Sequence, residues 1–187
     1  MYMYEQIPWF PAWGIKFTEG IEDTNKVLSI FNELKSDSRW LLLAFDAAAS
    51  ERHLWTAWYS TKRNEKNGKM IANSVDAEFI RLVAGTHQVK IAFNNAGIRK
   101  GDEAFWIIRL PESEIGSSID EAFINRDSYN IYDSKANLLI ERMGGELISQ
   151  RPIATLRGLT RIGYDKQVNE AQSLEECFIL HLVSSKI

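Results

Sequence analysis

A continuous apolar run in the first quarter of the chain, Trp40-Leu41-Leu42-Leu43-Ala44-Phe45, limits the fold more than any other feature. A strand with one face in water alternates apolar and polar residues, whereas a short unbroken run is typical of a strand covered on both faces. We therefore expect such a strand within Arg39 to Ala47. The run is far shorter than the roughly 20 residues that cross a bilayer, so we expect no membrane partner.

Five segments have the periodicity of helices, with apolar residues three or four positions apart. Asp23 or Thr24, Ser50 and Thr86 are residue types that cap helix N-termini, and Gly85 suits a helix C-terminus because it enters the left-handed region at low cost. The expected helices span residues 24–34, 50–62, 76–84, 86–96 and 134–143.

Segments rich in aromatic and β-branched residues indicate further strands at Met1 to Ile7, Gly14 to Phe17, Ala104 to Leu110 and Glu175 to Ser184. Residues 112–130 read as a loop with a helical turn, and residues 146–166 fit no pattern. Neither a repeat nor a linker divides the chain. We therefore expect one α+β domain over residues 1–187.

The charge is unevenly distributed along the chain. In total, 22 Lys plus Arg against 25 Asp plus Glu give a formal charge of −3, which excludes a uniformly basic protein that wraps nucleic acid. Residues 51–100, however, hold 9 basic and 4 acidic side chains, a balance of +5. A basic surface is therefore compatible with the negative total.

Signatures of catalysis, cofactors and metals are weak in this sequence. It has no phosphate-binding glycine-rich loop, and its three histidines and one cysteine are scattered. Ser50, His53 and Asp46 suggest a triad, but Ser50 is better explained as a helix cap. We expect no catalytic, cofactor-binding or metal-binding residues. A lone Cys177 cannot form an internal disulfide, which favours a reducing, cytoplasmic location.

A series of short motifs between residues 41 and 110 resembles the kinase-binding subunit of the KEOPS complex, the PRPK-binding protein family. The motifs come in the family's order: Ala44-Phe45-Asp46-Ala47, Glu51-Arg52-His53-Leu54, Asn73-Ser74, Glu78-Phe79-Ile80-Arg81-Leu82, Gly85-Thr86-His87-Gln88-Val89 and Gly97-Ile98-Arg99-Lys100-Gly101. A strand from Phe105 to Arg109 follows, and Leu174 to Leu182 resembles the closing strand of the family. Where the family usually has a basic residue between Gly-Thr and Gln, this chain has His87.

The resemblance implies a fold and a role that the residues alone do not. It implies a central, largely antiparallel sheet packed with helices. It also implies a non-catalytic subunit that binds and stimulates a small atypical, RIO-like kinase/ATPase. The complex makes N-threonylcarbamoyl-adenosine in tRNA, and archaeal-type members contact the tRNA acceptor end.

Basic side chains on or between the two central helices are the candidate tRNA contacts, since Lys and Arg bind phosphates and an imidazole can stack on an unpaired base. They are Lys69, Arg81, His87, Lys90, Arg99 and Lys100. The alternative is an ordinary solvated helix surface, because exposed charges need no further function.

The tail is the candidate kinase contact, with Phe178, Leu180 and Leu182 on one face of the expected strand. The alternative is a central strand buried on both faces. Two other classes of function stay open: a standalone RNA-binding module without a kinase partner, and a small enzyme with an unrecognised pocket.

Overall fold

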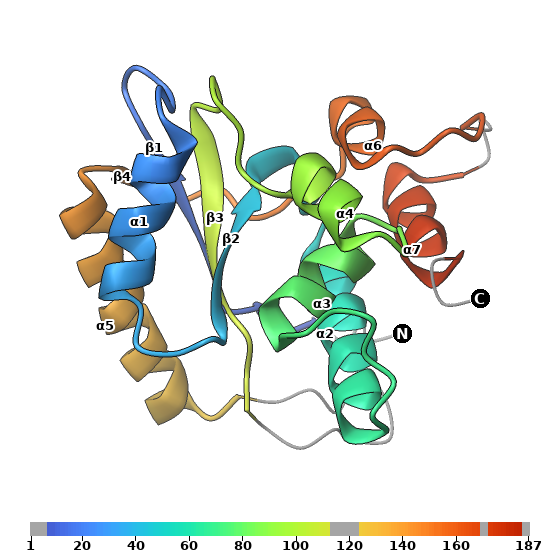
Figure 1. The fold of residues 1–187 in the computed structure, drawn as a ribbon, viewed down its shortest axis with the longest axis horizontal. Helices are drawn as coiled ribbons and strands as arrows, with labels where there is room; N and C mark the ends of the chain where they lie inside the picture. Colours follow the sequence, from blue (N-terminus) through green and yellow to red (C-terminus); the bar gives the residue numbers. More distant parts are fainter. Residues whose placement is uncertain (1–6, 113–123, 169–171, 185–187) are drawn as a thin grey trace, which may run out of the picture.

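An antiparallel four-stranded sheet forms the centre of the computed structural model, which describes residues 7–112, 124–168 and 172–184 (Figure 1). The strands are β1 (Ala12–Lys16), β2 (Trp40–Ala44), β3 (Ala104–Arg109) and β4 (Glu146–Ile148), in the spatial order β2-β3-β1-β4. Trp40 pairs with Arg109 at one end of β2 and Ala44 pairs with Phe105 at the other. The expected strand in the apolar run is therefore confirmed, with every residue of β2 buried.

Side chains of β2 alternate between two separate apolar clusters, one on each face of the sheet. Leu41 and Leu43 belong to the larger cluster, and Trp40 and Leu42 belong to the smaller one. Because successive side chains of a strand point to opposite faces, one unbroken apolar run supplies both cores. This explains why the run shows no polar residue.

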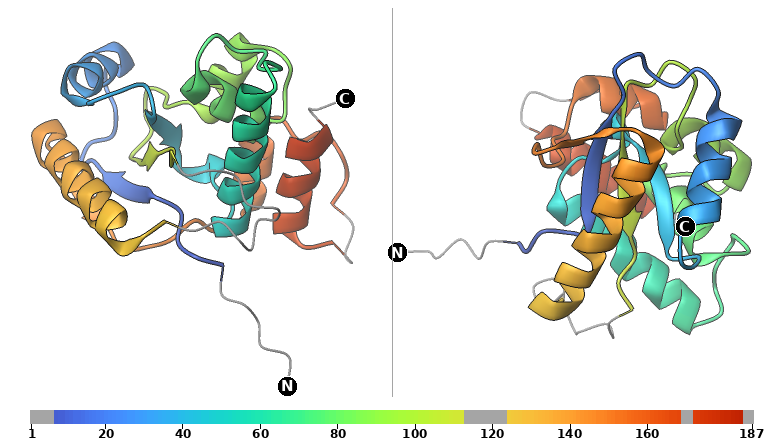
Figure 2. Two further views of the ribbon diagram at one scale, coloured as in Figure 1. Left: turned by 90° about the horizontal axis from the view of Figure 1, so that it is seen from below. Right: turned by 90° about the vertical axis from the view of Figure 1, so that its left-hand side faces the viewer.

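Helices cover both faces of the sheet (Figures 1 and 2). On one side lie α1 (Thr24–Leu34) and α5 (Arg126–Met143). On the other lie α2 (Glu51–Lys66), α3 (Val75–Val83), α4 (Val89–Ala96), α6 (Leu156–Ile162) and α7 (Leu174–Ser184). A 3₁₀ turn, η1 (Phe45–Ala47), leads from β2 toward α2. The described residues thus form one α+β domain with three layers.

Helix boundaries follow the predicted capping residues closely. The Asp23 side chain accepts hydrogen bonds from the Asn25 and Lys26 N–H groups, and the Ser50 hydroxyl accepts one from His53 N at 3.0 Å. Gly85 has a φ of +59°, which confirms its place after α3. Thr86 is different, because α4 begins at Val89 and Thr86 instead accepts the Gln88 N–H within the preceding turn at 3.2 Å.

The expected strand from Glu175 to Ser184 is wrong, because this segment is the helix α7. An apolar run of this length suits either structure, and its neighbours decide. The Ser173 hydroxyl accepts the Glu176 N–H at 3.2 Å, while the Glu176 carboxylate accepts the Ser173 N–H at 3.0 Å. This reciprocal pair is a capping box, a helix-start signal that is present in the sequence.

Other elements differ from the expectation in their extent or were not expected. The helix expected at 134–143 begins earlier, at Arg126, where Asn125 caps it. Residues 146–166, which fitted no pattern, contain β4 and α6. The expected first strand lies almost entirely outside the described residues, as does most of the loop expected at 112–130.

Candidate functional site

A cavity of about 490 Å³ opens where the end of α2, the loop after it and the turn after α3 meet. We call it the cationic cavity. Its lining residues are Arg63, Asn64, Asn67, Lys69, Ile71, Arg81 and His87. Four of these are basic and none is acidic, so the cavity favours an anionic ligand. Three of the six predicted tRNA-contacting residues, Lys69, Arg81 and His87, are thus brought together here.

Glu78 is buried beside the cavity and shapes it. Its carboxylate accepts hydrogen bonds from the Asn64 side chain at 2.8 Å and from the Ile71 and Ala72 N–H groups at 3.1 Å each. Burial alone would raise the pKa of Glu78. The hydrogen bonds from Arg81, Ala72 and Asn64 outweigh that effect, and the pKa is lowered. An ionised Glu78 therefore ties α2 and the loop that follows it to α3.

Arg81 completes this network from the same helix. Its Nη2 donates to Glu78 Oε1 at 2.7 Å, its Nε donates to Glu78 Oε2 at 3.0 Å, and its Nη1 donates to the Thr86 carbonyl at 2.8 Å. The residue is only 1% exposed. Arg81 therefore lies in the cavity wall as a positioning residue, and its burial leaves little of it for the phosphate contact predicted from the sequence.

Lys69 and His87 stand on the rim of the cavity, and both are exposed. Lys69 follows the end of α2, where its N–H donates to the Asn64 carbonyl at 2.8 Å. His87 lies in the turn that Arg81 holds through Thr86. Arg63, an exposed residue of α2, adds a cation that the sequence prediction missed. Helical spacing could not reveal it, because the cavity exists only where α2 meets a loop.

Lys90, Arg99 and Lys100 do not line the cationic cavity. Lys90 is exposed on α4, and Arg99 and Lys100 follow that helix, whose 8 residues span about 12 Å. Arg99 Nε donates to the Asn94 carbonyl, and its backbone N–H donates to the Asp102 carboxylate at 2.7 Å. Burial and the nearby Arg161 lower the pKa of Arg99, while Asp102 acts in the opposite direction.

The predicted kinase contacts separate on α7. Phe178 and Leu182 are fully buried in the larger apolar cluster, so they cannot form a docking surface, and that part of the prediction is wrong. Leu180 is 48% exposed. Residues four apart share a helix face, whereas residues two apart do not, which is why the strand pattern grouped the wrong side chains.

His53 is fully buried at the position where the sequence suggested a triad. Its Nδ1 accepts the Ala49 N–H at 3.3 Å, and its ring lies edge-on to Phe178 with 5.3 Å between ring centroids. Burial, with a smaller contribution from His181, lowers the pKa of His53 to about 3. The Ser50 hydroxyl is engaged in capping α2, so the two side chains form structural contacts.

Metal ligands do not cluster in the described parts of the chain. No three or more His, Cys, Asp or Glu side chains are grouped there in a way that could hold a metal ion. None of the helices described is both long enough and apolar enough to cross a membrane.

No protein-family model matches the chain, and no curated protein is significantly similar to it.

Proposed function

We propose that this protein is a non-catalytic accessory subunit of a KEOPS-type complex. In this role it binds and stimulates a small atypical, RIO-like kinase/ATPase and contacts the acceptor end of tRNA, in support of N-threonylcarbamoyl-adenosine modification. The cytoplasm is the location that this role requires.

The cationic cavity is the observation that carries the tRNA part of the proposal. The exposed cations of Arg63 and Lys69 can pair with phosphates. Asn64 and Asn67 add amide groups that can donate and accept hydrogen bonds. Proteins that bind single-stranded nucleic acid combine such a charged groove with side chains on which bases stack. The exposed imidazole of His87 supplies a ring of that kind.

The resemblance to the KEOPS subunit also supports the cationic cavity as the tRNA-binding site. The segment from Glu78 to Leu82 provides the buried pair that shapes the cavity, and the segment from Gly85 to Val89 carries His87. These motifs lie together around one basic cavity, which supports a common role for them in binding. The antiparallel sheet covered by helices is also the fold that the resemblance implies.

Titration with fluorescently labelled tRNA tests the proposal directly. We expect saturable binding to tRNA that ends in its unpaired acceptor tail and weaker binding to the same tRNA without that tail. Lys69→Glu combined with His87→Glu should weaken binding about tenfold or more, because two positions on the rim become repulsive. Equal affinity for the two tRNAs would remove the acceptor tail from the proposal.

A matched variant and a second pair sharpen this experiment. Lys26→Glu repeats the Lys69→Glu part of that change on α1, across the sheet from the cavity, and should leave tRNA affinity unchanged. Arg99→Glu with Lys100→Glu tests whether the far end of α4 also contacts RNA. Unchanged binding in that pair would remove Arg99 and Lys100 from the site.

A further inference from the structure

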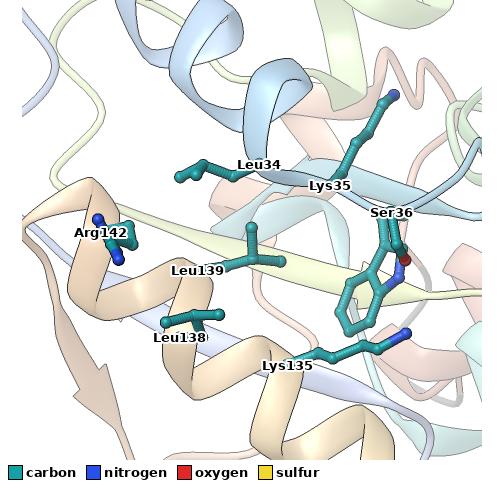
Figure 3. Close-up of a pocket in the computed structure, with 8 residues that line it drawn as sticks. Leu34, Lys35, Ser36, Lys135, Leu138, Leu139 and Arg142 are labelled. Atoms are coloured by element: carbon teal, nitrogen blue, oxygen red, sulfur yellow. The ribbon is translucent and has the colours of Figure 1, made fainter.

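A second cavity, of about 340 Å³, lies between the C-terminal end of α1 and the side of α5 that faces it (Figure 3). It is on the face of the sheet opposite the cationic cavity and is called here the α1–α5 cleft. Its lining residues are Leu34, Lys35, Ser36, Trp40, Lys135, Leu138, Leu139 and Arg142. Nothing in the proposed function uses this cleft.

The walls of the α1–α5 cleft are apolar and unusually open to solvent. Leu34 reaches in from α1 and Leu138 from α5, and they are 39% and 53% exposed. On α5, Ile131 is also 56% exposed and lies seven residues before Leu138, two turns away on the same face. The helix already buries Leu139 and Ile140 against the sheet, so its exposed apolar stripe exceeds what its own packing requires.

Three cations stand around these walls. In Figure 3, Arg142 lies at one end of the cleft, and Lys35 and Lys135 lie at the other. No ion pair joins any of the three to another described residue, and no acidic side chain lines the cleft. Lys35 does lie over the Phe31 ring at 5.6 Å. The cleft thus presents an apolar centre between two positively charged ends.

We propose that the α1–α5 cleft is a docking site for an acidic amphipathic helix of a partner protein. Helices that bind in grooves insert apolar residues at i, i+3 or i+4 and i+7, and the exposed Leu34 and Leu138 on the two sides of the cleft offer apolar contacts to such a row. Glu or Asp residues that flank this apolar face would meet Arg142 at one end and Lys135 at the other. Charge complementarity of this kind selects partners and aligns them.

The probe is a labelled helical peptide of about 18 residues, with Leu on one face at i, i+4, i+7 and i+11 and Glu beside that face. Binding to the full chain is followed by fluorescence anisotropy. We expect saturable binding that weakens as salt rises, since the three cations are near the surface. The same peptide with Lys in place of every Glu should not bind.

Variants locate the peptide in the cleft. Leu138→Glu should abolish binding, and Lys135→Glu with Arg142→Glu should weaken it about tenfold or more. The controls are Leu156→Glu, which repeats the Leu138 change, and Arg52→Glu, which makes one such charge reversal. Both lie at exposed sites on helices across the sheet and should leave affinity within about twofold, as changes at distant sites usually do.

Three results would overturn the proposal. They are no saturable binding of the acidic peptide, equal binding of the Lys peptide, and equal binding by the Leu138→Glu variant. Sedimentation of the free chain adds a fourth, because a dimer that Leu138→Glu dissociates would make a second copy of this chain the occupant.

Discussion

At the scale of single residues, the fold buries two titratable side chains in opposite charge states. His53 is enclosed as a neutral ring beside Phe178, whereas Glu78 is enclosed as an ionised group with Arg81. Burial disfavours the charged form of both, and the difference lies in the partners. Glu78 receives hydrogen bonds that favour its charge, while His53 receives one at Nδ1 that requires the neutral ring.

Stability should fall in mild acid because of His53. Its folded-state pKa of about 3 lies below the ordinary value of 6.5. Between these values the unfolded chain binds the extra proton, so folding is favoured above pH 6.5 and loses stability as the pH falls toward 3. We expect a loss of about 2.5 kcal/mol between pH 7 and pH 4.5 from this group, measured by urea unfolding.

His53→Leu should flatten that pH dependence, and His87→Leu, at an exposed histidine, should leave it unchanged. If the His53→Leu chain loses stability in acid as steeply as the natural one, another group is responsible.

Replacement of the buried Arg81 side chain by an uncharged one should lower the free energy of unfolding. Arg81→Met leaves Glu78 charged and buried without its cation, a change that costs about 3–5 kcal/mol in comparable pairs. Equilibrium unfolding measures this cost. Combining it with Glu78→Gln should recover part of the loss, and a double variant no more stable than Arg81→Met would show that the ion pair is not the cause.

At the scale of elements, the sequence predicts most helices and strands because each carries its own signals. Asp23, Ser50 and Gly85 mark ends through local hydrogen bonds or through φ, and these need no tertiary information. The prediction of a strand in the tail is wrong for the opposite reason. The tail residues are apolar on every side, and only the capping box at Ser173 and Glu176 indicates a helix instead of a strand.

The helical form of α7 changes which tail residue is the candidate contact for the proposed kinase partner. Leu182→Glu places a charge in the larger apolar cluster and should destabilise the fold by about 4 kcal/mol or more. Leu180→Glu should stay folded, within about 0.5 kcal/mol of the natural chain, and should lose co-purification with the kinase. Thermal unfolding and affinity capture of the complex measure the two effects.

Ile153→Glu is the matched control for Leu180→Glu, since Ile153 is similarly exposed and lies outside α7. It should keep the kinase. Retention of the kinase by Leu180→Glu as well would place the interface elsewhere.

At the scale of the whole molecule, the candidate site depends on contacts that no sequence window contains. The basic balance of residues 51–100 locates the region, and Lys69 and His87 do meet at one cavity. The sequence prediction missed Arg63 and did not foresee the burial of Arg81, because both depend on how α2, α3 and two loops meet. Lys90 and Arg99 are also basic, but they lie on α4 and just after it and do not line the cavity. Periodicity alone cannot distinguish these residues from the ones that do.

The small number of exposed cations at the cavity predicts a weak dependence of tRNA binding on salt. For single strands, the logarithm of affinity falls by about 0.7 per neutralised phosphate for each unit in the logarithm of salt concentration. With Arg63 and Lys69 as the exposed phosphate contacts, we expect a slope of about −1.4. A fluorescence titration at several salt concentrations measures it. A slope of about −4 would instead indicate a broad basic surface.

The alternation of β2 between two cores has a consequence for how this chain can vary. Insertion of one residue inside β2 would turn the side chains on one side of the insertion to the opposite face of the sheet, so residues of both cores would be misplaced at once. Replacement of one β2 residue by another apolar one disturbs only one core. Related chains should therefore differ in length before Arg39 or after Ala47 and keep the 5 residues of β2, from Trp40 to Ala44, unbroken.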